Sequence, residues 1–202
     1  MFSIINILSL SSDNEIVEGC QKGLRKYQYL LYDRYASKLM TVCMRYVVNR
    51  AEAEEMLQEG LIRVFKNITS FKSNGNNSVY YWMKRIVINT ALNYLRDNKK
   101  HRFMEPVERI DENISEFYEQ EETSDWFEQI DMDKIMQIIQ SLPTGYKTVF
   151  ALYSIEEYSH HEISEMLGIS VNTSKTQLMK ARRTILQKIK ESNKEFYLKK
   201  IC

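Results

Sequence analysis

The chain has 202 residues, of which 44% are hydrophobic, with 28 Lys and Arg against 27 Asp and Glu. This length holds one or two domains, and the composition lies in the globular range, which excludes a chain that is disordered throughout. Only two prolines and six glycines occur, too few to supply the turns of many short strands, whereas good helix formers are abundant. We therefore predict an all-α protein.

The net charge of +1 is the sum of three segments that differ in charge. Residues 1–102 carry 16 basic and 9 acidic residues, residues 103–128 carry one Arg and 10 acidic residues, and residues 129–202 carry 11 basic and 8 acidic residues. Two basic segments around an acidic one are typical of two domains that meet a polyanion, with a linker that avoids or imitates it. A solvated linker without such a role is the simpler alternative. We predict two small helical domains joined by an acidic flexible linker.

The N-terminus and the cysteines favour a cytoplasmic location. Residues 1–12 form an apolar extension without a basic leader or a cleavage signal, and it is shorter than the roughly 20 residues that cross a bilayer. Cys20, Cys43 and Cys202 are far apart and odd in number, which argues against a disulfide framework or a zinc site and favours a reducing compartment. We expect no membrane insertion, no metal and no cofactor.

Hydrophobic spacing and breakers predict the elements in chain order. A first helix carries apolar residues at helical intervals, at Leu31, Tyr35, Leu39, Cys43 and Tyr46. A break precedes a second helix over 51–66, and a polar, turn-rich loop over 71–78 precedes a third helix over 79–98. After the acidic segment, helices are predicted over 130–140 and 144–155, separated by a Ser-Leu-Pro stop.

The most informative local pattern follows residue 158. Ser159 and Glu162 have the spacing of a capping box, which satisfies unpaired N–H groups at a helix start. Gly168 can end this helix in the left-handed conformation, and Ser170 caps a second, basic helix over 171–190. A short helix, a Gly turn and a basic helix make a helix-turn-helix.

In a helix-turn-helix, the second helix lies in the major groove, where residues near its N-terminus reach base edges and basic residues meet phosphates. The residues placed for this are Thr173, Lys175, Thr176, Met179 and Lys180. The alternative is a plain helical hairpin whose Lys and Arg side chains are only solvated. The positive charge of the segment favours DNA.

The predicted third helix has an unusual polar side, which is formed by Trp82, Arg85, Asn89, Asn93 and Arg96, whereas Val87, Ile88, Ala91 and Leu95 occupy the other side. Asn and Arg can hydrogen-bond bases, and aromatic rings, including those of Tyr80 and Tyr81, can stack on unpaired ones. This side therefore suits melted DNA. The alternative for Trp82 is an ordinary core position.

The predicted second helix begins with an acidic run in an otherwise basic domain. Favourable interaction with the helix dipole explains the carboxylates of the first turn, but it does not explain Gln58 and Glu59. An acidic surface with Leu61 and Phe65 as apolar anchors suits a basic protein partner.

Together, these segments resemble the small, two-domain extracytoplasmic-function (ECF) group of the sigma-70 family of bacterial RNA polymerase sigma factors. Residues 31–36 resemble the opening motif of the family, and residues 53–65, with their Gln-Glu pair, are similar to its polymerase-binding segment. Residues 82–96 are similar to its promoter-melting and minus-10-reading helix. The Leu-Pro pair and the helix-turn-helix resemble the domain that reads the minus-35 element.

The resemblance implies an N-terminal extension over 1–12, sigma region 2 over 13–102, an acidic linker over 103–128 and sigma region 4 over 129–202. It assigns core polymerase binding to Glu55, Gln58, Glu59 and Leu61, minus-10 DNA binding to Asn74, Gly75, Asn76, Trp82, Arg85, Asn89 and Asn93, and minus-35 DNA binding to Thr173, Lys175, Thr176, Met179 and Lys180. The implied partners are core RNA polymerase, promoter DNA and an anti-sigma factor. The implied function is promoter-specific initiation with help in melting DNA, without a catalytic residue or a cofactor.

One segment departs from the family pattern. The family often has Thr-Val-Lys-Ser at the start of the recognition helix, whereas this chain has Thr173-Ser174-Lys175-Thr176, which puts a polar residue at an apolar position. We therefore expect an atypical minus-35 preference.

Two other classes of function remain as alternatives. A helix-turn-helix repressor would occupy duplex operators without polymerase, and it would need a dimerisation surface, for which the sequence shows no heptad seam. A nuclease would need clustered carboxylates or His, but His160 and His161 lie at a helix start and the acidic residues concentrate in the linker.

Overall fold

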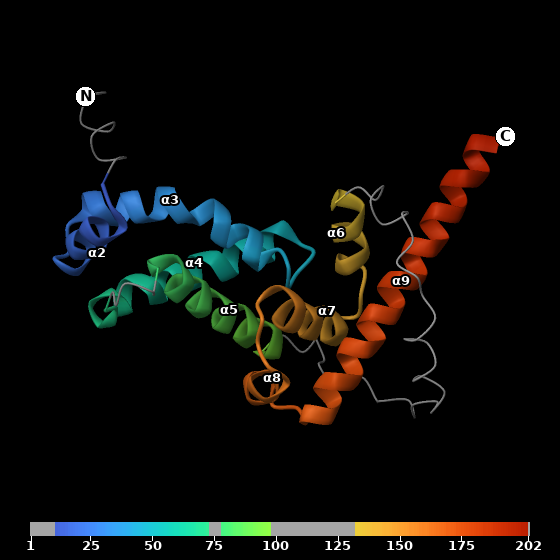
Figure 1. Ribbon diagram of the computed structural model, residues 1–202. Coiled ribbons are helices and arrows are strands. Elements are labelled where there is room, and N and C mark those ends of the chain that lie inside the picture. The colour runs from blue at the N-terminus through green and yellow to red at the C-terminus, as the bar shows by residue number, and fades with distance from the viewer. Residues whose placement is uncertain (1–10, 73–77, 98–131, 202) are drawn as a thin grey trace. The chain divides into compact units, whose positions relative to one another are not determined.

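The computed structural model describes residues 11–72, 78–97 and 132–201, and every regular element in these ranges is helical (Figure 1). The chain divides into two compact units, Met1–Asn98 and Lys99–Cys202. The prediction of an all-α protein with two helical domains is thus confirmed. The apolar N-terminus up to residue 10, the loop over 73–77 and the acidic linker lie outside the described residues.

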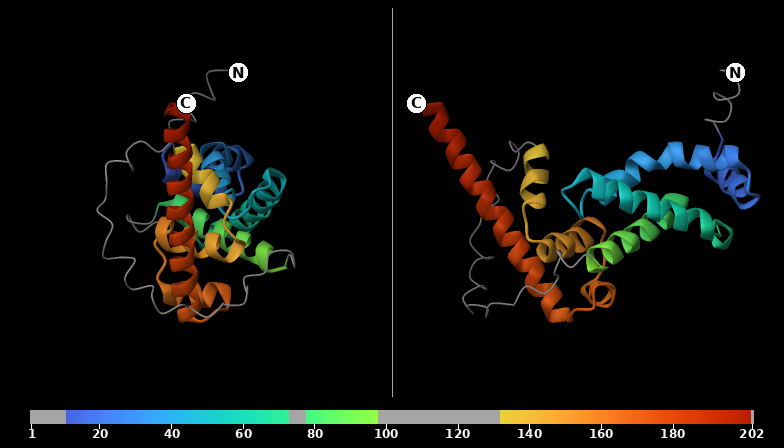
Figure 2. Two further views of the ribbon diagram at one scale, coloured as in Figure 1. Left: turned by 90° about the vertical axis from the view of Figure 1, so that its right-hand side faces the viewer. Right: turned by 180° about the vertical axis from the view of Figure 1, so that it is seen from behind.

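The described part of the first unit consists of α2 (Asp13–Gln21), α3 (Arg25–Cys43), α4 (Arg50–Asn67), the short 3-10 turn η1 (Ile68–Ser70) and α5 (Val79–Asp97). Helices α3, α4 and α5 pack against one another and lie side by side (Figure 2). The predicted second helix is confirmed to within one residue at each end. Asn49 caps it, because its Oδ1 accepts a hydrogen bond from the N–H of Ala51 at 2.9 Å.

Helix α2 was not predicted from the sequence. It begins at a capping box in which Ser12 Oγ accepts from the N–H of Glu15 at 3.3 Å, while the Glu15 carboxylate accepts from the N–H of Ser12 at 2.8 Å. Asp13 then joins α2 to α3, since it accepts from Arg34 Nη1 at 2.8 Å and from the Tyr35 hydroxyl at 2.5 Å. This short helix is held by polar contacts to a distant segment as well as by its own apolar side.

The core of the first unit contains the apolar positions that helical spacing predicted, at Leu31, Tyr35, Leu39, Cys43, Tyr46, Val87, Ile88, Ala91 and Leu95. Helices α4 and α5 approach closely at Gly60, where a Cβ atom would lie 2.9 Å from Cγ2 of the buried Val87. A glycine is required at this crossing because a side chain would overlap the facing helix.

The described part of the second unit consists of α6 (Met132–Gln140), α7 (Thr144–Phe150), the π-helical segment η4 (Ala151–Ile155), α8 (His160–Leu167) and α9 (Val171–Ile201). The expected end of the last helix at residue 190 is wrong, because α9 continues to Ile201. No Gly or Pro follows residue 190 to stop it. Although α9 has 31 residues, neither it nor another described helix is long and apolar enough to cross a membrane.

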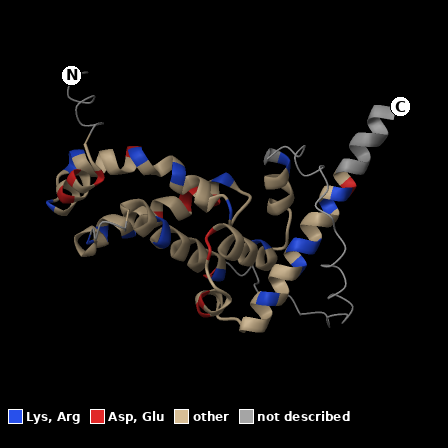
Figure 3. Ribbon diagram, in the orientation of Figure 1, with Lys and Arg blue, Asp and Glu red and all other residues tan. Residues whose placement is uncertain are grey.

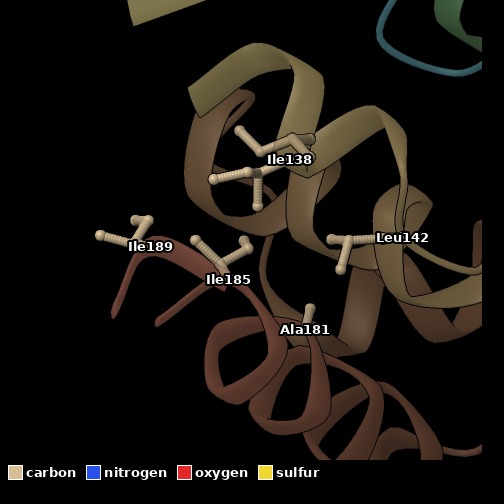
Figure 4. Packing of buried hydrophobic residues seen from close by; sticks show 6 residues of the cluster. Ile138, Leu142, Ala181, Ile185 and Ile189 are labelled. Carbon is tan, nitrogen blue, oxygen red and sulfur yellow. The ribbon is translucent and has the colours of Figure 1, made fainter. Parts of the chain in front are cut away.

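An apolar cluster holds the middle of α9 in place. Ile138 and Ile139 of α6, with Leu142 just after it, pack against Ala181, Ile185 and Ile189 of α9 (Figure 4). The α9 residues recur at intervals of four, so they form one stripe along the helix. Tyr146 and Phe150 of α7 pack against the same cluster, and α8 contacts the first turn of α9 through His160 and Ser174.

We expect Gly60→Ala to destabilise the first unit by about 1 kcal/mol, since overpacking costs about 1–3 kcal/mol and the higher helix propensity of Ala recovers up to about 1 kcal/mol. The added methyl group would lie 2.9 Å from Cγ2 of Val87 and 3.4 Å from its Cα, so α4 and α5 must move apart. Urea unfolding of the full-length protein measures the change. In a Val87→Ala background the clash is removed, and the same substitution is expected to be nearly neutral. An equal loss in both backgrounds would contradict the close approach.

Candidate functional site

One side of α4 presents the polar residues that were predicted to bind a protein partner. Glu55, Gln58 and Glu59 are all exposed, and Glu59 accepts a hydrogen bond from Arg63 Nε at 2.9 Å, one turn later. Exposed ion pairs of this kind contribute little to stability. Folding therefore does not account for these side chains, which are available to a partner.

The structure contradicts the assignment of Leu61 to this surface. Its side chain is only 5% exposed, whereas Ile62 is 48% exposed. The reason is helical geometry, because positions 55, 58, 59 and 62 share one side of a helix and position 61 lies on another. The sequence analysis overlooked Ile62, although its spacing from Glu55 was sufficient to find it. We name Glu55, Gln58, Glu59 and Ile62 the α4 surface.

The polar side of α5 contains the residues predicted to bind melted DNA. Arg85 and Asn89 are exposed, and Trp82 and Asn93 are half-buried. Asn93 Oδ1 accepts a hydrogen bond from Arg96 Nη2 at 2.6 Å. The opposite side of the helix is buried in the core, so the described residues form one stripe. Asn74, Gly75 and Asn76 lie outside the described residues.

Trp82 has both a core contact and an open side. Its ring packs against Phe71, with the ring centroids 5.3 Å apart. Gln21 in turn holds this segment, because its Nε2 donates to the carbonyl oxygens of Ile68 at 3.1 Å and Phe71 at 3.0 Å. The sequence analysis missed Gln21, since its partners are 47 and 50 residues away and no local spacing points to them.

Three neighbouring tyrosine rings lie at the start of α5. Tyr80 stacks on Tyr35 with ring centroids 5.7 Å apart, whereas Tyr81 is 59% exposed. The Lys84 ammonium lies 5.2 Å from the centre of the Tyr81 ring. An exposed aromatic ring beside a cation is a combination found in surfaces that bind single-stranded nucleic acid.

The predicted helix-turn-helix is confirmed by its capping contacts. Ser159 Oγ accepts from the N–H of Glu162 at 3.3 Å, and the Glu162 carboxylate accepts from the N–H of Ser159 at 2.8 Å. Gly168 has φ +66° and ends α8 in the left-handed region. Ser170 Oγ accepts from the N–H of Thr173 at 2.9 Å at the start of α9.

The five residues predicted to contact duplex DNA lie in the first ten residues of α9. Lys175 is exposed, and Thr173, Thr176, Met179 and Lys180 are half-buried. Thr173, Thr176 and Lys180 share one side of the helix, and Lys175 and Met179 the adjacent side. Further Lys and Arg residues follow along α9, where the ribbon is blue (Figure 3), as expected for contacts to phosphates.

Ser174, the residue that departs from the family pattern, is fully buried. Its Oγ lies 2.9 Å from Nδ1 of His160 on α8. Partial burial lowers the pKa of His160 below its ordinary value of 6.5, and the positive charges of Lys175 and Arg182 lower it further. The neutral ring is thus the favoured form beside the recognition helix. The sequence analysis placed His160 at a helix start but did not pair it with Ser174.

The described residues contain no cluster of three or more His, Cys, Asp or Glu side chains that could hold a metal ion. Burial raises the pKa of Cys20 to about 11 and that of Cys43 to about 12. Both thiols are therefore protonated at neutral pH, and a thiolate is the form that acts as a nucleophile.

We expect the second unit to lose stability as the pH falls below about 6.5, the ordinary pKa of His160. The unfolded chain binds this proton more readily because the pKa of His160 is lower in the folded protein, so protonation favours unfolding. The contribution of neutral His160 to the free energy of unfolding is fully present above its ordinary pKa. It is lost as the pH falls through the lower pKa that His160 has in the folded protein. Urea unfolding at several pH values, followed through the methyl NMR signals of Ile163, measures this. His160→Phe should remove this part of the pH dependence, and an unchanged profile would contradict the assignment.

Comparison with known families agrees with the two units. The family described as Sigma-70 region 2 matches residues 31–101, and the family described as Sigma-70, region 4 matches residues 132–185. The first match runs from within α3 through α4 and α5, and the second covers the elements from α6 into α9. Together they account for more than half of the chain.

Curated relatives extend the likeness over most of the chain. The ECF RNA polymerase sigma-E factor of Haemophilus influenzae is 31% identical over 187 residues, which cover 88% of this chain and 95% of that protein. Its Escherichia coli K12 counterpart is 29% identical over 183 residues, covering 88% and 94%.

Two solved structures are similar in outline. CnrH in complex with the cytosolic domain of CnrY has a TM-score of 0.48 and 16% identity, covering 90% of this chain and 99% of that one. The sigma factor RpoE in complex with the anti-sigma factor NepR from Bartonella quintana has a TM-score of 0.47 and 14% identity, covering 79% and 94%. On the family matches and the 31% identity to a curated relative, this protein belongs to the ECF group of the sigma-70 family of RNA polymerase sigma factors.

Proposed function

We propose that the two units of this alternative sigma factor have different roles, with polymerase and minus-10 binding in the first and minus-35 binding in the second. As a member of this family, the protein binds core RNA polymerase and directs it to promoters by recognising minus-35 and minus-10 elements. The observation that carries this conclusion is that the region 2 match falls on the first unit and the region 4 match falls on the unit with the helix-turn-helix. We keep 13–102 and 129–202 as the limits of the two sigma regions, with the acidic linker over 103–128 between them.

The α4 surface is the proposed contact with core polymerase. It combines two carboxylates and an amide with the exposed side chain of Ile62. Charged groups around an apolar side chain give a protein interface its specificity and an anchor. Ile62 takes the place that the sequence analysis gave to Leu61, which is buried.

The polar side of α5 is the proposed site for the minus-10 element. Trp82, Arg85, Asn89 and Asn93 contribute an aromatic ring and hydrogen-bonding groups to one stripe, which suits bases that have left the duplex. We retain Asn74, Gly75 and Asn76 in this site by the resemblance of their segment to the base-binding loop of the family.

The start of α9 is the proposed site for the minus-35 element. Thr173, Lys175, Thr176, Met179 and Lys180 are the residues that would reach base edges and phosphates. The protein would bind free duplex weakly, because each DNA contact alone is small and polymerase is needed to make both act together.

The remaining features follow from this role. We propose that the protein catalyses no reaction of its own, since polymerase forms the bonds of the transcript. Its site of action is then the cytoplasm, where core polymerase works. Family membership also supports an anti-sigma factor as a second protein partner.

Transcription with purified core RNA polymerase tests the function directly. We expect discrete start sites that depend on the added protein when fragments of its own genome are the templates. The sequences upstream of these start sites should align into two elements at a fixed spacing. Tight binding to duplex operators without polymerase, together with no protein-dependent transcript, would favour the repressor instead.

Replacing Gln58 and Glu59 together by Ala should weaken binding to core polymerase about tenfold or more, the range of central interface residues. The free energy of unfolding should change little, because both side chains are exposed. Glu54→Ala is the matched control, since Glu54 is also exposed and pairs with Arg50 Nε at 2.9 Å, just as Glu59 pairs with Arg63. Titration of fluorescently labelled protein with core polymerase measures both. Equal losses in the double variant and the control would remove the assignment to Gln58 and Glu59.

A further inference from the structure

A buried hydroxyl lies in the middle of the proposed minus-35 site. Ser174 is fully buried, although its neighbours Thr173 and Lys175 belong to the residues proposed to meet DNA. A buried polar group is costly unless it is hydrogen-bonded. Its partner is Nδ1 of His160, at 2.9 Å, so one side-chain contact joins α8 to the first turns of α9.

The His160 ring is itself held from the other side. It stacks on Tyr153 of η4, with ring centroids 4.4 Å apart and planes inclined by 23°. The guanidinium of Arg182, on α9, lies 5.7 Å from the centre of the Tyr153 ring. Ser174, His160, Tyr153 and Arg182 thus form one set of contacts, the His160 stack, which begins and ends on α9 and passes through α8 and η4.

The position of the His160 stack separates it from the rest of the core of this unit. The apolar cluster around Ile138 and Ile185 holds α9 against α6, whereas the His160 stack acts near the turn between α8 and α9. The contact between His160 and Ser174 thus holds the first turn of α9, whereas the apolar cluster holds its middle.

We propose that Ser174, His160 and Tyr153 are positioning residues for minus-35 DNA. They set the orientation of the first turns of α9 and hold the exposed side chain of Arg182 toward a phosphate of the duplex. This inference rests on the proposed function of α9 as the minus-35 reader. Contacts to phosphates fix the register of a recognition helix on DNA, so a change in the His160 stack alters which bases the neighbouring side chains reach.

The charges around the stack are consistent with this role. Lys175 and Arg182 lower the pKa of His160, which keeps the ring neutral while both cations remain available to the DNA backbone. The serine that departs from the family pattern is then matched by a hydrogen-bonding partner on α8.

A double-mutant cycle tests the hydrogen bond. The readout is the ratio of initiation on a promoter with its minus-35 element to initiation on the same promoter with that element scrambled. Ser174→Ala and His160→Phe should each lower this ratio about threefold to tenfold, the range of one hydrogen bond. The double variant should lose little more than either single one, because both changes remove the same contact. Additive losses would overturn the pairing.

Three further variants separate positioning from plain stability. Ile189→Val shortens a buried side chain that packs on α6, so it should lower the free energy of unfolding without changing the ratio. His160→Asn keeps a polar group near Ser174 but removes the ring from Tyr153. Tyr153→Leu should make the plot of the logarithm of DNA affinity against the logarithm of salt concentration shallower, reducing the magnitude of its negative slope by up to about 0.9, the value for one lost phosphate contact.

The outcomes distinguish this inference from the function on which it rests. If the unchanged protein responds to the minus-35 element and the Ser174 and His160 variants respond equally, the positioning role is overturned while the function stands. If Ile189→Val lowers the ratio as much as they do, the His160 stack only stabilises the fold. If the unchanged protein initiates equally well without a minus-35 element, both proposals fail.

Discussion

The close contact between α4 and α5 determines the geometry of the first unit. Gly60 allows the two helices to meet, with the fully buried Val87 against its backbone. Gly60 directly follows Gln58 and Glu59 on α4, and Val87 lies between Arg85 and Asn89 on α5. The proposed polymerase surface on α4 and the proposed surface for melted DNA on α5 are therefore both close in sequence to the residues of this one contact. A tightly packed core transmits displacement, so a shift of one helix at this contact displaces its neighbour.

In the second unit, two kinds of contact hold one long helix, α9. The middle of α9 is held by an apolar cluster with α6, and its first turns by the contacts around the turn after α8. Apolar packing secures the helix but is tolerant of small rotations, whereas hydrogen bonds and ring stacking restrict direction. A recognition helix needs both properties, since it must be stable and must also present its side chains at a fixed angle.

The charged side chains on the surface of the protein each contribute little to its stability. Charges on α4 and along α9 are mostly exposed, and exposed charges are screened by salt and add little to stability. Their use lies in recognition, because acidic groups on one surface and basic groups on another favour different partners. When polymerase holds the two units on one promoter, modest contacts at two DNA elements combine through effective concentration.

Periodicity and capping residues were sufficient for most of the fold. The spacing from Leu31 to Cys43 located the buried side of α3, and Ser159, Glu162 and Gly168 located the boundaries of α8, because such signals act within a few residues of the chain. The same local rule placed Glu55, Gln58 and Glu59 on one side of α4, and strict use of it would have replaced Leu61 by Ile62. The extension of α9 beyond residue 190 was not predicted, because the apolar stripe that indicated this helix ends at Ile189.

The sequence by itself thus determined the helices, their capped ends and the helix-turn-helix, and it indicated the segments proposed to meet protein or DNA, since each of these depends on neighbouring residues. Only the tertiary structure decided that Gln21 holds the segment before Trp82, that Gly60 meets Val87, and that His160 is the partner of Ser174. These contacts join different helices across 14 to 50 residues of chain. Their distances and angles are set by packing, which no local pattern of residues encodes.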